Sequence, residues 1–441
     1  MPAARSNPAR PGPSTSRSDA MTVHDLSPVR SGGDADLPHY PQPREQGCPF
    51  APPEQIRTLA AEKPLHRVRW WDGSTPWLVT GPAELRSLLT DSRVSADDVH
   101  YAVPQWSPTE ARESKRRPTT FLNTDGNEHR RYRRMLTRSF SVKRANALRP
   151  MIQRHTDECI DAMLAGPRPV DLMTALALPV PTIAICALLG VPYEDHETFQ
   201  RHISTGVDRS VPAEEGQRAM AELFDYLRTF VTREVEHPTG ADTICAELGE
   251  QVRAGNVTMD TAIFMATSVL GGGFETTANM IGLGTLAFLL NPDQAAIVRA
   301  SEDPTVTVGA IEELLRYLAV AGNSKCRVAL ADIEIAGETI RAGEGIVSGF
   351  PAANWDSGAF AEPERLDVTR QGNHHLAFGF GPHGCIGQQL ARVELQVVFD
   401  TLLRRIPDLR LATSLDEIEF KNNTRAYGVY ALPVTWGPVK R

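Results

Sequence analysis

Near its C-terminus the chain reads Phe378-Gly379-Phe380-Gly381-Pro382-His383-Gly384-Cys385-Ile386-Gly387, which places one cysteine in a run with four glycines. Glycine lacks a side chain and tolerates positive φ, so this backbone can lie flat against a broad ligand and direct several N–H groups at one atom. Leu390, Val393 and Val397 follow at helical spacing and predict a helix that begins beside the Cys385 sulfur. The dipole and the free N–H groups of a helix N-terminus favour a thiolate there.

A second interpretation of Cys385 is a buried structural cysteine, because free cysteine is among the residue types most often buried. The glycines favour a ligand instead, since a lone thiolate on a flat platform is what a haem iron with a cysteine axial ligand requires. The pattern Phe-Gly-x-Gly-x-His-x-Cys-x-Gly also resembles the haem-binding loop of the cytochrome P450 superfamily. This resemblance implies that Cys385 is the axial ligand of a haem b iron, that Phe378 packs against the ligand loop and that His383 bonds a haem propionate.

A long apolar stretch from Thr261 to Leu290 predicts a helix that stops at Asn291-Pro292, where proline ends it. Its length would suit a membrane span, but the polar residues at its centre favour a helix that crosses the protein core. Three glycines, residues 271–273, lie inside it, at a cost of about 1 kcal/mol each relative to alanine. They indicate either close helix packing or the close approach of a ligand.

Glu275 and Thr276 follow those glycines almost at once. The run from Gly272 to Thr277 resembles the distal helix of the same superfamily, and the resemblance implies that the acid and the alcohol line an oxygen pocket and deliver protons to iron-bound dioxygen. These residue types suit the task, because heterolytic O–O cleavage needs protons while the thiolate supplies electron density. The residues alone leave Thr276 and Thr277 as alternatives for the alcohol, and the family register favours Thr276.

A structural brace is predicted from Glu313 and Arg316, which are spaced i, i+3 on one side of a predicted helix. Such pairs are usually surface ion pairs worth less than about 1 kcal/mol. Glu-x-x-Arg at this distance before the cysteine loop resembles a motif of the superfamily, and Arg365 matches the third member of its buried network. The resemblance implies that Glu313, Arg316 and Arg365 together hold the segment below the haem.

The propionates of a buried haem need cations or hydrogen bonds. His129 and Arg133 lie one turn apart on a predicted helix, a spacing that surface residues also show. Their surroundings resemble the propionate-binding helix of the family, and Arg327 matches its other arginine. With His383, the resemblance implies four propionate contacts.

The whole chain has 441 residues, of which 41% are hydrophobic and 23% charged, and we expect one large domain. Six scattered cysteines without a CxxC pair argue against a disulfide framework or a zinc site. Residues 1–45 are rich in Pro, Ser, Arg and Gly and hold no long apolar run. We expect a disordered tail there, with Met21 as an alternative start, ahead of a domain over 46–441 in a soluble, cytoplasmic protein.

Helical patterns dominate from about residue 128 to 320, and short β segments are predicted around 333–335, 346–347 and 427–434. Residues 66–71 and 76–80, separated by Asp72-Gly73, predict a hairpin. The fold class is therefore mainly α with small β-sheets (α+β). The resemblance implies the single-domain, triangular-prism fold of the P450 superfamily.

The net charge of −8 argues against nucleic acid as a partner. A local basic cluster is nevertheless present, and a run of charges is usually a solvated face. Because the composition of the whole chain is not basic, we interpret this cluster as a docking site for an acidic electron donor such as a ferredoxin. The basic cluster comprises Arg130, Arg131, Arg134, Arg138, Lys143 and Arg144.

The resemblance covers nearly the whole chain and is strongest to actinobacterial members that oxidise natural products or foreign compounds. It implies a haem-thiolate monooxygenase that inserts one atom of O2 into an apolar organic molecule, with electrons from NAD(P)H through a ferredoxin reductase and a ferredoxin. The alternatives are another haem-thiolate reaction (peroxide-driven oxidation, nitration or nitric oxide reduction) and a non-enzymatic haem sensor. The expected substrate pocket comprises Val103, Trp106, Leu270, Gly271, Phe274, Ala321, Gly322 and Tyr427, an apolar set that points to no particular molecule.

Overall fold

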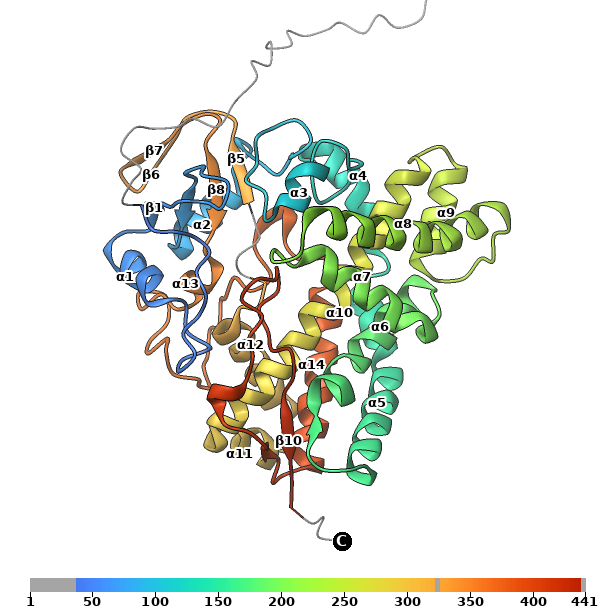
Figure 1. Cartoon of the computed structure of the whole chain (residues 1–441), viewed down its shortest axis with the longest axis vertical. Coiled ribbons are helices and arrows are strands. Elements are labelled where there is room, and N and C mark those ends of the chain that lie inside the picture. The colour runs from blue at the N-terminus through green and yellow to red at the C-terminus, as the bar shows by residue number, and fades with distance from the viewer. Residues whose placement is uncertain (1–36, 322–325, 438–441) are drawn as a thin grey trace, which may run out of the picture.

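The computed structural model describes residues 37–321 and 326–437. It shows a body of helices with a small sheet region at one side (Figure 1), which confirms the expected fold class. The helices are α1 (Glu54–Glu62), α2 (Pro82–Thr90), α3 (Pro108–Glu113), α4 (Gly126–Thr137), α5 (Val142–Ala165), α6 (Pro179–Leu189), α7 (His196–Val207), α8 (Ala213–Glu236), α9 (Ile244–Arg253), α10 (Met259–Leu290), α11 (Pro292–Ala300), α12 (Pro304–Leu318), α13 (Phe350–Asn354) and α14 (Gln388–Arg405). The strands are β1 (Leu65–Arg67), β2 (Trp77–Val79), β3 (Val94–Ser95), β4 (Val170–Asp171), β5 (Cys326–Ala329), β6 (Ile333–Ile335), β7 (Glu338–Ile340), β8 (Gly345–Ser348), β9 (Arg410–Leu411) and β10 (Pro433–Thr435).

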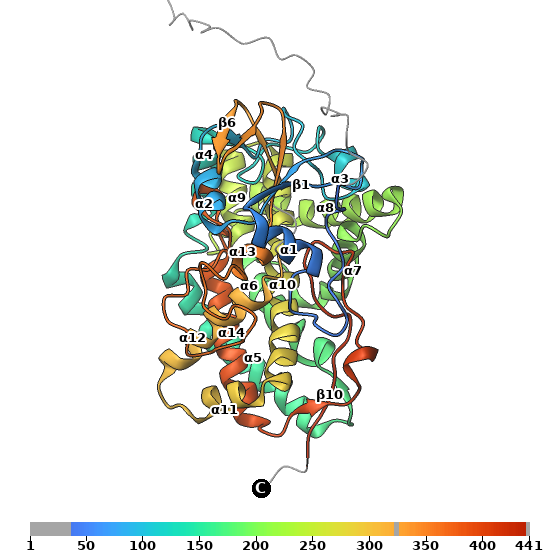
Figure 2. The ribbon, with the colours of Figure 1, turned by 90° about the vertical axis from the view of Figure 1, so that its left-hand side faces the viewer.

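Helix α10 runs through the middle of the helical body in both ribbon views (Figures 1 and 2) and packs against α6, α8, α12 and α14. The hydroxyl of Thr258 caps its first turn by accepting from the Thr261 N–H at 3.1 Å. It ends at Leu290, and the proline at position 292 begins α11, as the sequence predicts. Most of its side chains are buried, so the apolar stretch is a core helix.

One observation bears on membrane crossing. Within residues 37–321 and 326–437, no single helix has the length and apolar composition of a membrane span. Helices α10 and α11 have that length and composition only when the two are counted together, and the chain bends by 105° between them.

The largest sheet has the order β1-β2-β8-β5-β3. Strands β1 and β2 form the predicted hairpin, with Leu65 opposite Val79, and β8 then adds to β2 in parallel, with Trp77 opposite Ile346. Strand β5 pairs with β8 and β3 in antiparallel fashion. Two smaller sheets have the orders β4-β10-β9 and β6-β7. The sheet matters for the site because β5 carries Arg327.

The segment ahead of α1 departs from the expected boundary at residue 45. Residues 1–36 of the expected tail lie outside the described residues, but residues 37–45 pack against the body. The Tyr40 N–H donates to the Arg69 carbonyl at 2.9 Å, and the buried Arg44 guanidinium donates to the carbonyls of Phe50 and Leu318 at 2.8 and 3.0 Å. Proline-rich composition concealed this packing, because two single side chains make the other contacts: the Tyr40 ring stacks on Trp70, and Arg44 reaches the two carbonyls.

Candidate functional site

The Cys385 loop uses the conformational freedom that its glycines provide. Gly379 and Gly381 adopt positive φ of 69° and 70°, which glycine adopts without strain. The Cys385 N–H donates to the Phe378 carbonyl at 2.8 Å and so closes the loop just ahead of α14. Cys385 itself is exposed, whereas Cys159, Cys186, Cys245 and Cys326 are buried. The interpretation of Cys385 as a structural core cysteine is therefore wrong.

The three glycines of α10 have three different surroundings. A Cβ at Gly273 would lie 2.5 Å from Ile185 Cδ1, so this glycine serves close helix packing, whereas a Cβ at Gly271 would lie an ordinary 3.8 Å from Ile203. A Cβ at Gly272 would meet nothing within 4 Å, and Gly272 is exposed although α10 lies in the core. Of these three glycines, only Gly272 therefore faces open space.

Thr276 lies one turn after Gly272 on the same face of α10, and its hydroxyl donates to the Gly272 carbonyl at 2.9 Å. Thr277 is buried on another face and interacts with the carboxyl of Glu394 on α14. This placement favours Thr276 as the alcohol that faces the open side. Glu275 beside it is buried, and burial raises the pKa of its carboxyl, while the charge of Lys421 opposes that rise.

The predicted propionate-binding residues lie on three elements, which are α4, the Cys385 loop and β5. The rings of His129 on α4 and His383 in the Cys385 loop lie 4.2 Å apart, and Arg133 donates from Nη2 to the Gly384 carbonyl at 2.7 Å. His383 also lies 3.1 Å from Asp125 through Nε2, an acid just ahead of α4 that the sequence analysis did not single out. Burial alone would raise the pKa of Asp125, but hydrogen bonds from His383 and Ser95 hold it below its ordinary value.

Two of these groups fit an anionic ligand. His129 is 2% exposed, and its Nε2 has no hydrogen-bond partner among the described residues. The buried Arg327 guanidinium donates to the neighbouring Cys326 carbonyl at 2.7 Å, and the charge of Asp125 opposes the fall in the Arg327 pKa that burial causes. Buried donors of this kind call for acceptors. The two carboxylates of haem would supply them.

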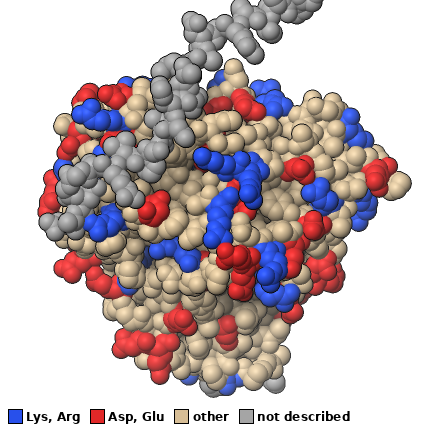
Figure 3. All heavy atoms as spheres, turned by 45° about the horizontal axis from the view of Figure 1, so that its top comes forward, with Lys and Arg blue, Asp and Glu red and all other residues tan. Residues whose placement is uncertain are grey.

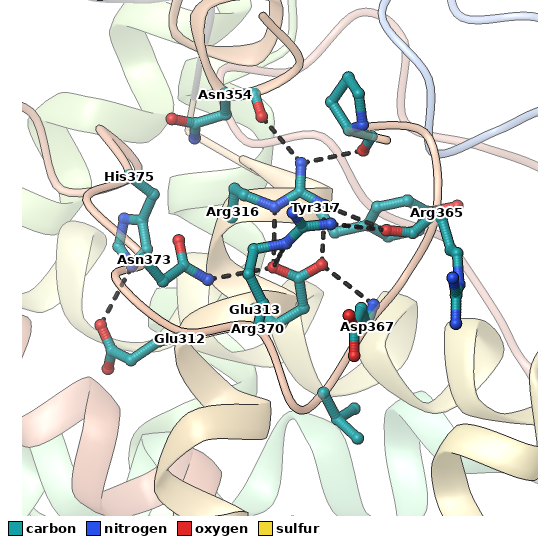
Figure 4. Close-up of polar contacts among 12 residues, drawn as sticks. Glu312, Glu313, Arg316, Tyr317, Asn354, Arg365, Asp367, Arg370, Asn373 and His375 are labelled. Carbon is teal, nitrogen blue, oxygen red and sulfur yellow. Dashed lines mark hydrogen bonds and ion pairs between the residues drawn. The ribbon is translucent and has the colours of Figure 1, made fainter. Parts of the chain in front are cut away.

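The predicted brace is formed by Glu313 and Arg316, both fully buried on α12 (Figure 4). Arg316 donates to both carboxylate oxygens of Glu313 at 2.8 Å, a two-point contact that suits the planar guanidinium. Its remaining N–H groups reach the carbonyls of Asn354 and Pro363 at 2.8 and 2.9 Å. Because its hydrogen bonds are satisfied on every side, this buried charge pair fixes three segments to one another.

The prediction that Arg365 is the third member of the brace is wrong. The Arg365 side chain is exposed and pairs with Glu362 at 3.3 Å, and only its carbonyl reaches Arg316. Arg370 takes the expected place and donates from Nε to Glu313 at 3.0 Å, and Asn373 adds a contact of 3.0 Å (Figure 4). The chain turns between positions 365 and 370. The match of Arg365 to the family motif therefore did not predict which of the two arginine side chains points toward Glu313.

A second, half-buried acid, Glu312, connects α12 to the Cys385 loop and to α14. Arg392 donates to it at 2.7 and 2.9 Å and also lies 4.6 Å from the Phe378 ring centroid. His375 lies 3.1 Å from the same carboxylate. Burial alone would raise the pKa of Glu312, but hydrogen bonds from His375 and Arg392 lower it to about 2. Phe378 is thus held beside the ligand loop by an arginine that sequence analysis had read only as part of a helix.

The expected substrate pocket is only partly supported. Leu270 and Phe274 are 0% and 1% exposed, and Phe274 packs against Phe199 with ring centroids 6.0 Å apart. Each lies two residues from Gly272, about 200° around the helix, so both point away from the open face. Gly271 and Ala321 are half-buried, and Gly322 lies outside the described residues.

The other expected pocket residues are buried. Val103 and Trp106 belong to an apolar cluster with Trp70 and Val328. Tyr427 stacks on Phe420 with ring centroids 5.9 Å apart, and the Arg44 guanidinium covers it at 4.1 Å. Trp106 and Tyr427 therefore support the walls of neighbouring elements in this structure, whereas Val103 also lines a cavity beside Pro104 and Gly345.

Ion pairs tie together the segments that lie around α3. Arg112 on α3 pairs with Glu214 on α8, Glu110 pairs with Arg425 of the C-terminal segment, and the Arg209 guanidinium lies 4.8 Å from the Trp106 ring centroid. On the face that Figure 3 shows, Lys and Arg gather near the centre with Asp and Glu beside them. Charges of both signs therefore meet on this side of the molecule, which gives it no single-sign field.

Comparison with known proteins agrees with this geometry. Residues 213–407 match the family model described as Cytochrome P450. The chain is 51% identical to Cytochrome P450 CYP105Q4 of Mycobacterium marinum over 94% of its own length and 99% of that protein. It is 45% identical to pentalenic acid synthase of Streptomyces avermitilis, over 89% and 96% of the two lengths. The crystal structure of GfsF has a TM-score of 0.84 at 51% identity and covers 90% of this chain and 100% of that one.

These relatives span nearly the full length of this chain at high identity, and the structure carries an exposed cysteine on a glycine loop, an open face at Gly272 of α10 and a buried His129 Nε2 without a hydrogen-bond partner among the described residues. The chain therefore belongs to the cytochrome P450 family of monooxygenases, in which a cysteine thiolate holds the iron of haem b.

Proposed function

We propose that this chain inserts one oxygen atom from O2 into an apolar organic small molecule, either a natural product or a foreign compound. The observation that carries the proposal is the retained pair on α10: the buried acid Glu275 and the alcohol Thr276 beside the open face at Gly272. Haem bound by Cys385 would supply the activation of dioxygen. The substrate class is supported by relatives such as pentalenic acid synthase, whose name places it in natural-product chemistry.

The chain's own groups have distinct tasks in this proposal. His129, Arg133, Arg327 and His383 would hold the haem carboxylates. Thr276 keeps its hydroxyl at the open face through its bond to the Gly272 carbonyl, so it can orient water there. Burial raises the pKa of the Glu275 carboxyl, which makes it easier for this group to accept and return a proton, as proton transfer requires.

The proposal is tested by Thr276→Ala, with Thr277→Val as its matched control. Thr276→Ala should consume NAD(P)H with little product, because the hydroxyl that orients water is gone. Thr277→Val should retain coupling, because Thr277 faces Glu394 instead. The ratio of product formed to NAD(P)H consumed measures both. Full coupling in Thr276→Ala would remove the assigned role.

We further propose that electrons arrive from an acidic ferredoxin at the basic cluster beside the Cys385 loop. The structure narrows that cluster, because Arg138 and Arg144 are paired with Asp242 at 2.8 and 3.1 Å. Arg130, Arg134 and Lys143 remain exposed on α4 and α5. Exposed charges of one sign steer association and make it sensitive to salt.

The charge-reversed variant Arg130→Glu with Arg134→Glu should slow reduction by the ferredoxin and flatten its dependence on ionic strength. Arg218→Glu with Arg233→Glu, two arginines of α8, repeats the charge change on another helix and should leave both unchanged. Stopped-flow reduction at several salt concentrations measures the effect. Equal rates and equal salt slopes in the two double variants would contradict docking at α4.

A further inference from the structure

The C-terminal segment around Lys421 reaches α10 beside the catalytic acid. The Lys421 N–H donates to the Gly428 carbonyl at 2.8 Å, which holds the two arms of this segment together. Its ammonium donates from Nζ to Asn279 Oδ1 at 3.2 Å. The amide of Asn279 in turn donates from Nδ2 to the Ala426 carbonyl at 3.1 Å. One α10 side chain therefore binds both the ammonium and the backbone of this segment.

Close packing fixes this contact. Asn279 is 0% exposed, and a Cβ at Gly428 would lie 2.1 Å from its Oδ1, so only glycine allows the segment to approach α10 this closely. A buried amide with its oxygen and its nitrogen both engaged has a defined orientation. The Lys421 ammonium therefore has a position that tertiary contacts fix, unlike the ammonium of a freely rotating surface lysine.

Asn279 lies four residues after Glu275 on α10, so the two side chains are one turn apart on the same face, with roughly 5–6 Å between their Cβ atoms. An ammonium bound to Asn279 is thus presented to the Glu275 carboxyl. The interaction is mutual: the charge of Lys421 opposes the rise in the Glu275 pKa that burial causes, and Glu275 opposes the fall in the Lys421 pKa.

Two other titratable groups face the same carboxyl. Asp208, in the connection after α7, raises the pKa of Glu275, so it acts against Lys421. Tyr430 lies in the same C-terminal segment, its ring centroid is 5.7 Å from Lys421 Nζ, and its own pKa is raised by burial and by Asp208. One cation and one anion from two separate segments therefore act on the pKa of Glu275 in opposite directions.

We infer that Lys421 is a positioning residue for Glu275: held by Asn279, it supplies the counter-charge that fixes the orientation and the protonation state of the catalytic carboxyl. The C-terminal segment is then part of the oxygen-activating site, although it contains none of the recognised sequence motifs. This inference rests on the proposed role of Glu275. Asp208 is the opposing group, so the two segments adjust the same acid in opposite directions.

The test is the titration of Glu275 itself in the haem-loaded protein, read by infrared difference spectroscopy, with Glu275→Gln used to assign the carboxyl band. Lys421→Met should shift the Glu275 titration upward by about 1 pH unit or more, because an opposite charge at this range is removed. Lys421→Arg keeps the positive charge and should leave the Glu275 titration close to its position in the unaltered protein. Asp208→Asn should shift it downward, because a like charge is removed while the Oδ1 that accepts from Ser210 is kept.

Lys63→Met removes an exposed lysine that pairs with Glu338 and serves as the charge-matched control, which should leave the titration in place. An unchanged Glu275 titration in both Lys421→Met and Asp208→Asn would overturn the inference. Shifts of the same sign in the two variants would overturn it as well, since a general disturbance of the site would then explain them.

The failure of this inference is distinguishable from failure of the proposed function. If Glu275→Gln retains full coupling of NAD(P)H to product while Lys421→Met still shifts the titration, the charge interaction between Lys421 and Glu275 stands and the proton-delivery role is lost. If Glu275→Gln uncouples while Lys421→Met leaves the titration unchanged, Glu275 is catalytic and Lys421 does not position it.

Discussion

Arg370 donates from Nε to the Glu313 carboxylate at 3.0 Å across 57 positions of sequence, and so joins a loop to the helix that carries the brace. The contact is nearly buried, with the Arg370 side chain 11% exposed and that of Glu313 0% exposed. Glu313 accepts from Arg316, Arg370 and Asn373 together, so its charge is spread over several donors. A carboxylate bound in this way holds the segment ahead of the Cys385 loop in place.

The brace predicts different outcomes for the two neighbouring arginines. Arg370→Ala should lower the free energy of unfolding by about 1.5 to 3 kcal/mol, because a buried charged acceptor loses one donor. Arg365→Ala should change it by less than about 0.5 kcal/mol, because that side chain is exposed. Urea unfolding followed by circular dichroism measures both. A larger loss in Arg365→Ala than in Arg370→Ala would restore the arrangement expected from the sequence.

The glycines of α10 offer a second matched pair. Gly272→Ala should stabilise the protein by about 0.5 to 1 kcal/mol through helix propensity, because its Cβ meets no protein atom. Gly273→Ala should destabilise it by about 1 to 3 kcal/mol, because Ile185 must move. Thermal unfolding of the two variants measures whether their effects on stability have opposite signs. Equal effects would mean that the two glycines share one environment.

His129 predicts a pH dependence of the haem-free protein. Burial first, then the charges of His383 and Arg133, lower the His129 pKa from 6.5 to about 4. Between those values the unfolded chain binds a proton that the folded protein does not, so stability is fully present above pH 6.5 and is lost as the pH falls toward 4. His129→Phe should remove this part of the slope, measured by urea unfolding at a series of pH values. An unaltered slope would show that His129 has the same pKa in the folded and the unfolded protein.

Cys385 carries the prediction for the cofactor. The reduced carbon monoxide complex should show the strongly red-shifted Soret band of a thiolate-bound haem, and Cys385→His should lose that shift while retaining haem. Cys48→Ser changes the other exposed cysteine and should leave the spectrum as it is. Optical spectra of the reduced protein with and without carbon monoxide are sufficient. A red-shifted band that survives in Cys385→His would place the thiolate elsewhere.

Local patterns predicted the elements of the fold well. The apolar stretch that ends at Leu290 and the hairpin of β1 and β2 are visible because periodicity and turn residues are local properties. The Glu313 and Arg316 pair was also visible, because both residues lie on one helix. The prediction that Leu270 and Phe274 line the substrate pocket failed because it took no account of the direction in which each side chain leaves the helix.

Residues contributed by distant segments were the hardest to predict. Lys421 and Asp125 act on the site through contacts with Asn279 and His383 that no spacing rule encodes. Arg370 was missed because a loop, unlike a helix, gives no fixed relation between position and direction. A motif identifies which chemistry a chain carries, whereas tertiary contacts decide which of several equivalent side chains takes part.

Arg44 has a practical consequence for shortened versions of the protein. Its guanidinium binds the Leu318 carbonyl at the last residue of α12, where a positive charge stabilises the helix end, and it covers the Tyr427 ring. A protein that begins at residue 45 or later lacks this cap on the helix that carries Glu313 and Arg316, and one that begins between 41 and 44 loses the Tyr40 contact with Arg69. Trimming and fusion junctions therefore belong before residue 37.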